Sequence, residues 1–385
     1  MQVENFIQQY KEIFQNSPEV ISIAPGRAEL IGNHTDYNKG YVMGTIMPFS
    51  TITLARRNEN RKMRVFSRNF NELIEFDLDN IPTKPKDHWS DYLLGIILEL
   101  KKSIKLNGFD AYIISNIPIG SGMSSSAALE ISFTGSIYGI FNIPIIKKEI
   151  ALIGYRAEHN FVKSNCGILD QFVSALGTKN KALLIDCKSE SYELLKIPNE
   201  IIPIMVDTGI RRAAADALRA RREEIKEAIK IIKRKQNIDS LRDLTIDDLE
   251  DLEKMLPQIL FKRIKHVIEE NERVIQMKDA LEHKALEKIK ELMYQSHLSS
   301  KDLYEVSIKE LDILVELAHK QNYVYGTRLS GAGFGGCTIN LVQKEKVNEF
   351  VQYILKEYFR HNKRIPTVFY GTNYNEFHIN KISNS

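Results

Sequence analysis

Features that would mark a secreted, zinc-binding or membrane protein are scarce in this sequence of 385 residues. It has only three cysteines, Cys166, Cys187 and Cys337, and they form no CxxC pair, which argues against a disulfide framework and against a zinc site. No run of about 18 apolar residues occurs, and the first residues are too polar for a signal peptide. We therefore expect a cytoplasmic protein that neither spans a membrane nor is exported.

An excess of charge of one sign is also missing, because 53 basic and 50 acidic residues give a net charge of only +3. Nucleic acids and anionic membranes attract strongly basic surfaces, so we expect neither as a partner. The densest basic stretch, residues 211–235, also carries acidic residues, and we interpret it as the solvated face of a helix. A small molecule fits this charge balance better.

The length of the chain favours two domains, since a single core rarely grows past about 250 to 300 residues. Residues 20–76 contain short β-rich runs between turns, whereas residues 126–141 and 148–161 have the periodicity of helices. After a strand at 201–206, residues 212–317 are mostly helical, and strands return near 336–342 and 367–370. This order predicts an α+β protein with domains at 1–200 and 201–385 and a cleft between them.

The segment Asn116–Glu130, NIPIGSGMSSSAALE, is the most informative motif. Gly120 and Gly122 allow the backbone to approach an anion closely, and the N-terminus of the following helix attracts negative charge. By itself the string could equally be a Gly/Ser turn with N-capping serines. It matches neither GxxxxGK[ST] nor GxGxxG, so any phosphate loop here is of another kind.

Two further segments are rich in polar residues or glycine. Ala24–Gly40, APGRAELIGNHTDYNKG, carries an arginine suited to a phosphoryl group and side chains suited to sugar hydroxyls. Leu329–Thr338, LSGAGFGGCT, places four glycines before a strand and exposes backbone N–H groups. Each segment alone could be an ordinary polar loop or tight turn, so the argument depends on their joint occurrence.

Together, these three motifs closely resemble, in order and separation, those of the galactokinases in the GHMP kinase superfamily. The resemblance also covers residues 157–177 and 293–318. It implies a two-domain GHMP kinase fold with the active site in the interdomain cleft, and a soluble enzyme, active as a monomer, that uses ATP and Mg²⁺ to phosphorylate the anomeric hydroxyl of galactose.

The resemblance also assigns roles by position. It implies that Arg27 and Asp170 are catalytic, with Asp170 acting either as the base or as an electrostatic orienter of the hydroxyl. It implies that Ser126 and Glu158 bind Mg²⁺. The expected sugar-binding residues are Asn33, His34, Thr35 and Asp36, and the expected ATP-binding residues are Gly120, Ser121, Gly122, Met123, Ser124, Ser125 and Ser126.

Two positions depart from the pattern of the family. Asn33 stands where galactokinases have an acidic residue that contacts the sugar's C6 hydroxyl, and Leu218 stands where they have a tyrosine. Loss of the charge at Asn33 would remove a repulsion against sugar acids. A related sugar such as galacturonate or N-acetylgalactosamine is therefore an alternative substrate. A sugar sensor without turnover is a further alternative, although the serine-rich loop is complete.

Overall fold

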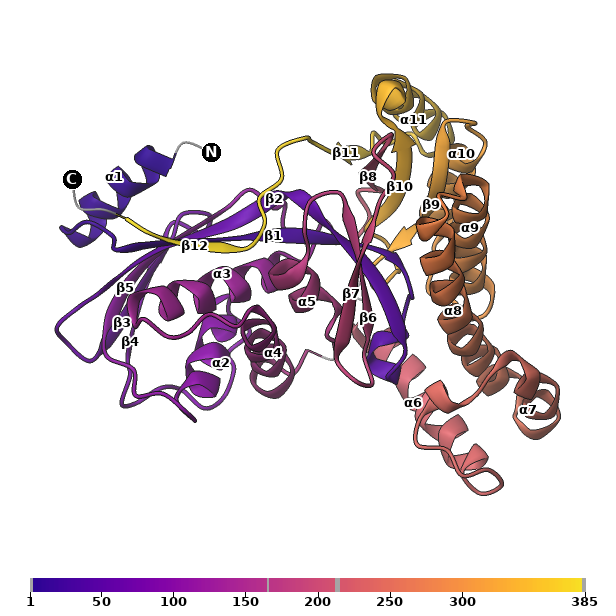
Figure 1. Cartoon of the computed structure of the whole chain (residues 1–385), viewed down its shortest axis with the longest axis horizontal. Coiled ribbons are helices and arrows are strands. Elements are labelled where there is room, and N and C mark those ends of the chain that lie inside the picture. The colour runs from indigo at the N-terminus through magenta and orange to yellow at the C-terminus, as the bar shows by residue number, and fades with distance from the viewer. Residues whose placement is uncertain (1–2, 165, 212–214, 383–385) are drawn as a thin grey trace.

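The computed structural model describes residues 3–164, 166–211 and 215–382 (Figure 1). Two β-sheets lie side by side, each covered by helices, and the chain begins and ends near the larger sheet. The strands are β1 (Val20–Ile31), β2 (Tyr41–Arg57), β3 (Lys62–Ser67), β4 (Glu72–Asp77), β5 (Phe109–Ser115), β6 (Lys181–Asp186), β7 (Ser191–Lys196), β8 (Ile201–Asp207), β9 (Val324–Ser330), β10 (Cys337–Gln343), β11 (Thr367–Phe369) and β12 (His378–Lys381).

Helices connect and cover these strands. They are α1 (Val3–Phe14), α2 (Ser90–Leu100), α3 (Ser125–Ile140), α4 (Lys147–Ala157), α5 (Leu169–Leu176), α6 (Ala215–Ile232), α7 (Leu249–Met255), α8 (Gln258–Glu282), α9 (Leu286–Asp302), α10 (Lys309–His319) and α11 (Val347–Asn362). A π-helical turn, Glu158–Val162, extends α4, and short 3₁₀ turns lie at Asp36–Asn38, Leu241–Asp243, Ile246–Asp248 and Lys344–Lys346. The prediction of an α+β fold is confirmed.

The larger sheet has the strand order β12-β1-β2-β5-β3-β4, with β6 paired to β2 and β7 paired to β6. Every residue of β1 is buried, because helices cover the sheet on both faces. Val20 and Ala24 belong to the apolar core that includes α3, α4 and α5, whereas Ile21 and Ile23 pack with α1. Phe6 and Tyr10 of α1 are buried in that second cluster, so the opening helix braces the face of the sheet that carries Ile21 and Ile23.

The smaller sheet has the order β11-β8-β10-β9. Helices α10 and α11 share an apolar cluster with one face of it, and side chains of α8 and α9 share another cluster with β10 and with residues of β1 and β2. Met43, Met205 and Cys337 all belong to this shared cluster. The two sheets are therefore joined by a continuous apolar interface, which fixes the walls of the cleft between them.

The end of the chain crosses the expected domain boundary. β8 opens the second sheet at Ile201, close to the division expected at residues 200 and 201. However, β12 pairs antiparallel with β1, with Val20 opposite Lys381, so the last strand belongs to the first sheet (Figure 1). The division into 1–200 and 201–385 stays a prediction, and the pairing of β12 with β1 implies that the last strand would belong to the first domain.

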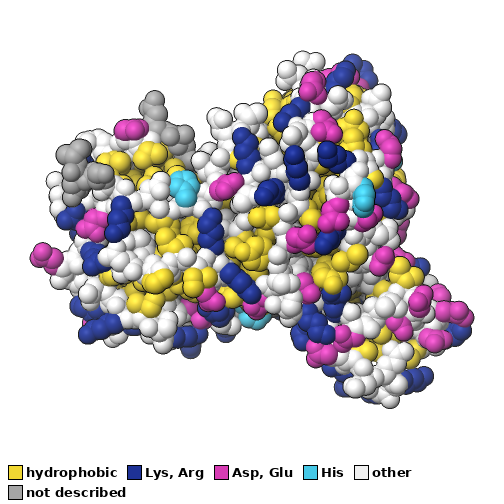
Figure 2. All heavy atoms as spheres, in the orientation of Figure 1, with side chains coloured by type: hydrophobic (Ala, Val, Ile, Leu, Met, Phe, Trp, Pro, Cys, Tyr) yellow, Lys and Arg dark blue, Asp and Glu magenta, His cyan; other side chains and the backbone are white. Residues whose placement is uncertain are grey.

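The surface carries both signs of charge. In Figure 2, Lys and Arg side chains alternate with Asp and Glu over the visible face, and no large field of one sign appears there. Across the part of the chain that the structure describes, no helix combines the length and the apolar character needed to cross a bilayer.

Candidate active site

Arg27 and Asp170 form the centre of the candidate site. Arg27 lies on β1, just after a register shift that its pairing with β2 shows between Pro25 and Arg27, and Asp170 lies in the first turn of α5. The guanidinium donates from Nε to Oδ1 and from Nη2 to Oδ2, each over 2.7 Å. The hydroxyl of Ser124 donates to the same carboxylate. The structure thus brings together two residues that lie 143 positions apart, as the sequence analysis expected.

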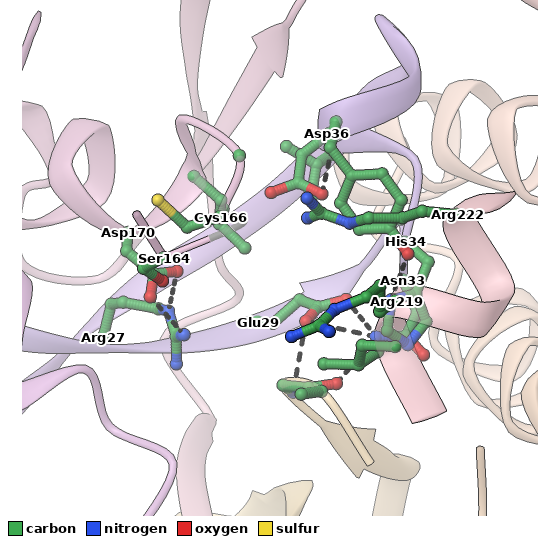
Figure 3. Close-up of a pocket in the computed structure, with 18 of the residues that line it drawn as sticks. Arg27, Glu29, Asn33, His34, Asp36, Ser164, Cys166, Asp170, Arg219 and Arg222 are labelled. Carbon is green, nitrogen blue, oxygen red and sulfur yellow. Dashed lines mark hydrogen bonds and ion pairs between the residues drawn. The ribbon is translucent and has the colours of Figure 1, made fainter. Parts of the chain in front are cut away.

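A cavity of about 440 Å³ opens beside this pair (Figure 3). Asn33, His34 and Asp36 from the first motif line it. Thr35 does not, because its buried hydroxyl points into the loop itself, where the backbone carbonyl oxygens of Gly32 and Tyr41 are both within reach of its one hydrogen. The expectation that Thr35 contacts the sugar therefore has no support from the geometry. The side chain instead stabilises the loop that carries its neighbours.

His34 presents a nitrogen atom with no partner of its own. Its Nδ1 lies 2.8 Å from the hydroxyl of Tyr37, and the ring stacks on Tyr304 at 4.7 Å, while Nε2 is buried and has no hydrogen-bond partner among the described residues. Burial, helped by the charge of His266, holds the pKa of His34 well below its ordinary value. In a neutral imidazole, Nε2 can form one hydrogen bond with a ligand hydroxyl, as donor or as acceptor depending on the tautomer.

Asp36 is a titratable acceptor in the cavity. Burial raises its pKa to about 7, with further contributions from the negative charges of Glu29 and Asp170. The backbone N–H of Tyr37 donates to Oδ1 over 2.9 Å, which leaves acceptor capacity on the carboxylate. The side chains of Asp36, His34 and Asp170 therefore offer several hydrogen-bonding groups that suit a polyhydroxylated ligand.

The helix α6 contributes to the same cavity: the resemblance pointed to Leu218, but the sequence analysis did not expect the two arginines beside it. Leu218, Arg219 and Arg222 line it, and the Arg222 guanidinium lies 4.1 Å from the centre of the Tyr37 ring. The interpretation of this basic stretch as a merely solvated face is wrong in part. Alternation of charge along a helix does not tell which of its faces another domain will cover, so the sequence carried little signal for these contacts.

A second cavity, of about 320 Å³, also has Arg27 in its lining. The predicted phosphate loop forms one wall, and the third motif forms another with residues 330–336. Gly120 and Gly122 both have φ of +72°, which accounts for glycine at these positions. Every residue that the sequence analysis assigned to ATP lines this cavity: Gly120, Ser121, Gly122, Met123, Ser124, Ser125 and Ser126.

The start of α3 is arranged to receive an anion. Ser124 is the N-cap residue, has φ of 51°, and makes no side-chain cap hydrogen bond to the helix, since its hydroxyl donates to Asp170 instead. The N–H groups of the first turn and the positive end of the helix dipole therefore have no capping side chain at this residue. The side chain of Met123 is fully buried in the apolar core, so only its backbone can serve a ligand.

Arg27, Gly331 and Ala332 line both cavities. A group bound in one cavity and a group bound in the other would thus meet at the Arg27 guanidinium. This is the geometry required for transfer of a charged group between two ligands, with a cation at the transfer point.

Of the two residues expected to bind Mg²⁺, Ser126 lines the second cavity, whereas Glu158 is buried and lines neither cavity. Burial raises the pKa of Glu158 to about 7, and the charge of Asp170 adds to the effect. Gln171 donates from Nε2 to both Glu158, over 2.7 Å, and Glu130, over 2.9 Å. A nearby cation stabilises the charged form of carboxyl groups that lie so close together, and Mg²⁺ prefers oxygen ligands. Among the described residues no cluster of three or more His, Cys, Asp or Glu side chains forms a metal site, so the hydroxyl of Ser126 and ligand phosphates would complete the set.

Comparison with known proteins agrees with this geometry. Family models match at residues 8–57, the galactokinase galactose-binding signature, at 91–178, the N-terminal domain of GHMP kinases, and at 277–361, their C-terminal domain. The mevalonate kinase of Methanococcus jannaschii shares the fold, with a TM-score of 0.63 and 21% identity over 91% of this chain and 97% of that one. The fold and its paired cavities therefore define a GHMP kinase, a class of ATP-dependent phosphotransferase.

More closely related proteins narrow the class. The galactokinase of Chloroflexus aggregans is 40% identical over 91% of this chain and 90% of its own length, and that of Clostridium perfringens is 40% identical over 90% and 91%. The structure of Lactococcus lactis galactokinase complexed with galactose matches with a TM-score of 0.92 and 34% identity, over 96% of this chain and 97% of that one. The chain belongs to the galactokinase family, whose members use ATP with Mg²⁺.

Proposed function

We propose that this protein transfers the terminal phosphoryl group of ATP to the anomeric hydroxyl of galactose and so makes galactose 1-phosphate. One observation carries the proposal: Arg27 lines both cavities and is paired with Asp170. In this scheme the sugar occupies the cavity beside Asp36 and His34, and the nucleotide occupies the cavity beside the phosphate loop.

The residues divide the chemistry between them. Asp170, held in one orientation by Arg27 and Ser124, points the reacting hydroxyl at the phosphorus atom and receives its proton as the bond forms. Arg27 stabilises the charge on the oxygen atoms of the group in transfer. Phosphoryl transfer needs mainly alignment and charge stabilisation, and a fixed carboxylate–guanidinium pair provides both.

Magnesium would be held by Ser126 and Glu158. When bound, it supplies positive charge that neutralises the phosphate oxygens. The N–H groups at the start of α3 would bind the same phosphates, so the loop and the cation would both stabilise these oxygen atoms.

We also propose that the enzyme works as a cytoplasmic monomer. Residues of a single chain line both cavities, so no second copy is needed to complete the site. The three cysteines are present as thiols, in keeping with a reducing compartment. Light scattering coupled to size exclusion, with and without galactose and Mg·ATP, tests the oligomeric state.

A substrate panel tests the proposed reaction. Purified protein with Mg·ATP would be given galactose, glucose, galacturonate and N-acetylgalactosamine, while ADP release and loss of the reducing end are followed. We expect both signals with galactose and much weaker ones with glucose. If ADP is released with galacturonate and with none of the other sugars, galacturonate is the substrate in place of galactose. If no sugar stimulates ADP release, the kinase assignment is overturned.

A further inference from the structure

A buried carboxylate that the sequence analysis did not single out lies inside the sugar cavity. Glu29 is on β1, its side chain is only 6% exposed, and it lines the cavity. Figure 3 shows it between Arg27 and Asp170 at one end and Asn33, His34 and Arg222 at the other. Burial of a charged carboxylate costs free energy unless the charge is paired and hydrogen-bonded.

Asn33 is bound to this acid. Its Nδ2 donates to Glu29 Oε1 over 3.1 Å and to the carbonyl oxygen of Gly331 over 2.9 Å. Its Oδ1 accepts a hydrogen bond from Ser300 over 3.1 Å. Both amide hydrogens are therefore engaged by the protein, and Asn33 has none left to donate to a sugar. Its amide acts mainly to hold the carboxylate of Glu29.

Glu29 retains acceptor capacity after its protein partners are counted. Besides Asn33, the backbone N–H of Gly331 donates to Oε2 over 3.1 Å, and Nη1 of Arg328 lies 3.4 Å from Oε1. A carboxylate offers about four lone-pair sites, so these three donors leave one for a ligand. Burial raises the pKa of Glu29, and the positive charges of Arg328 and Arg27 and the hydrogen bond from Asn33 oppose this rise.

Charge balance gives Glu29 a second role. Arg328 is fully buried, and its Nε and Nη2 have no hydrogen-bond partner among the described residues. Its Nη1 is paired with Glu29, which therefore balances the charge of this cation. Around the cavity, the basic side chains of Arg27, Lys163, Arg219 and Arg222 face the acids Glu29, Asp36 and Asp170. Loss of Glu29 would leave this lining markedly more positive and more open to an anionic sugar.

We propose that Glu29, oriented by Asn33, is the substrate-selecting acid of the sugar cavity: it accepts a hydrogen bond from a hydroxyl of the sugar and repels a sugar acid. The charge that seemed lost at Asn33 is thus supplied four residues earlier on the same strand and loop. The inference rests on the proposed sugar kinase function and removes the physical reason for expecting galacturonate as the substrate.

The test compares kcat/KM for galactose and for galacturonate in four proteins. These are the wild type, Glu29→Gln, the exchange Glu29→Asn/Asn33→Glu, and the control Glu269→Gln, whose glutamate is outside this cavity. We expect the wild type and the control to prefer galactose, Glu29→Gln to lower that preference by about tenfold or more, and the exchange to restore most of it. Mg·ATP binding should change little in any of them.

Each outcome decides a different point. If the wild type phosphorylates no sugar, the proposed function falls. If the wild type is active on galactose but Glu29→Gln keeps the full preference, or if the wild type uses galacturonate equally well, this inference falls. Because Glu29→Gln leaves Arg328 without its acid, the variant could unfold. The exchange, which keeps one carboxylate in place, then decides: loss of its preference for galactose would overturn the inference.

Discussion

The side chains of Arg27 and Asp170 form a bidentate ion pair, with Nε–Oδ1 and Nη2–Oδ2 distances of 2.7 Å. Arg27 is 8% exposed and Asp170 is 24% exposed, so the arginine is fixed in the wall while the carboxylate keeps one side open to the cavity. A hydroxyl that reaches this open side lies next to the guanidinium that also lines the phosphate cavity. The pair therefore determines where transfer can occur.

Replacement of Asp170 by Asn should nearly abolish turnover. The amide keeps the size of the side chain but cannot accept a proton, and we expect kcat to fall by about 10³-fold. ADP release gives the rate, and circular dichroism checks the fold. Asp216→Asn is the control, because that carboxylate is 91% exposed. A near-normal kcat in Asp170→Asn would exclude its catalytic role.

Replacement of Arg27 by Lys tests the geometry of the positive charge. Lysine keeps the charge but cannot hold Asp170 and a phosphoryl oxygen with a planar fork. We expect kcat to fall by about 100-fold while the dissociation constant of galactose changes less. Stopped-flow rates and calorimetric titration separate the two quantities. Equal losses in galactose binding and in kcat would instead mean that Arg27 mainly shapes the sugar cavity.

The pKa of Asp36, raised to about 7 by burial and by the charges of Glu29 and Asp170, predicts a pH effect on binding. Below about pH 7 the carboxyl is protonated and is a weaker acceptor for a sugar hydroxyl. The KM for galactose should therefore rise as the pH falls through this value. Asp36→Asn should show a high KM with no such rise, and an unchanged pH profile in that variant would refute the assignment.

The same shift has a consequence for stability. Because the folded-state pKa of Asp36 exceeds its ordinary value of 3.8, its contribution to stability is present below that value and is lost as the pH rises through about 7. The free energy of unfolding of Asp36→Asn, relative to wild type, should thus be higher at about pH 8 than at about pH 5. Urea unfolding at both values measures this, and the opposite order would contradict the shift.

Glu158→Gln should weaken the response to magnesium. Loss of one charged oxygen ligand should raise the Mg²⁺ concentration for half-maximal rate by about tenfold, with galactose binding preserved. Glu130→Gln is a matched control, since Glu130 contacts the same Gln171 amide and burial raises its pKa well above the ordinary value. If only Glu130→Gln changes the response to magnesium, then Glu130, and not Glu158, is the metal ligand.

Leu218→Tyr should improve the enzyme for galactose. Leu218 lines the cavity, so a tyrosine hydroxyl there could add one hydrogen bond to the sugar, and we expect KM to fall by about fivefold. Leu218→Phe adds the ring without the hydroxyl and should not give this gain. Equal KM values for the Tyr and Phe variants would show that the hydroxyl does not reach the sugar.

The sequence by itself determined the local structures that carry the phosphate site. Glycines at 120 and 122 allow positive φ, and the serines after them begin a helix, because both effects depend on neighbouring residues in the chain. The motifs and their order were also sufficient to recognise the galactokinase family.

Tertiary structure alone decided which polar residues face the sugar cavity. In the first motif, His34 has φ of 63°, so side chains along this loop do not alternate, and Thr35 turns away while Asn33 turns towards Glu29. The face of α6 that lines the cavity, the burial of Arg328 beside Glu29, and the return of β12 to β1 all depend on contacts between distant segments. Local sequence cannot specify such contacts, because burial and charge pairing arise only when the two sheets and their helices close around the cleft.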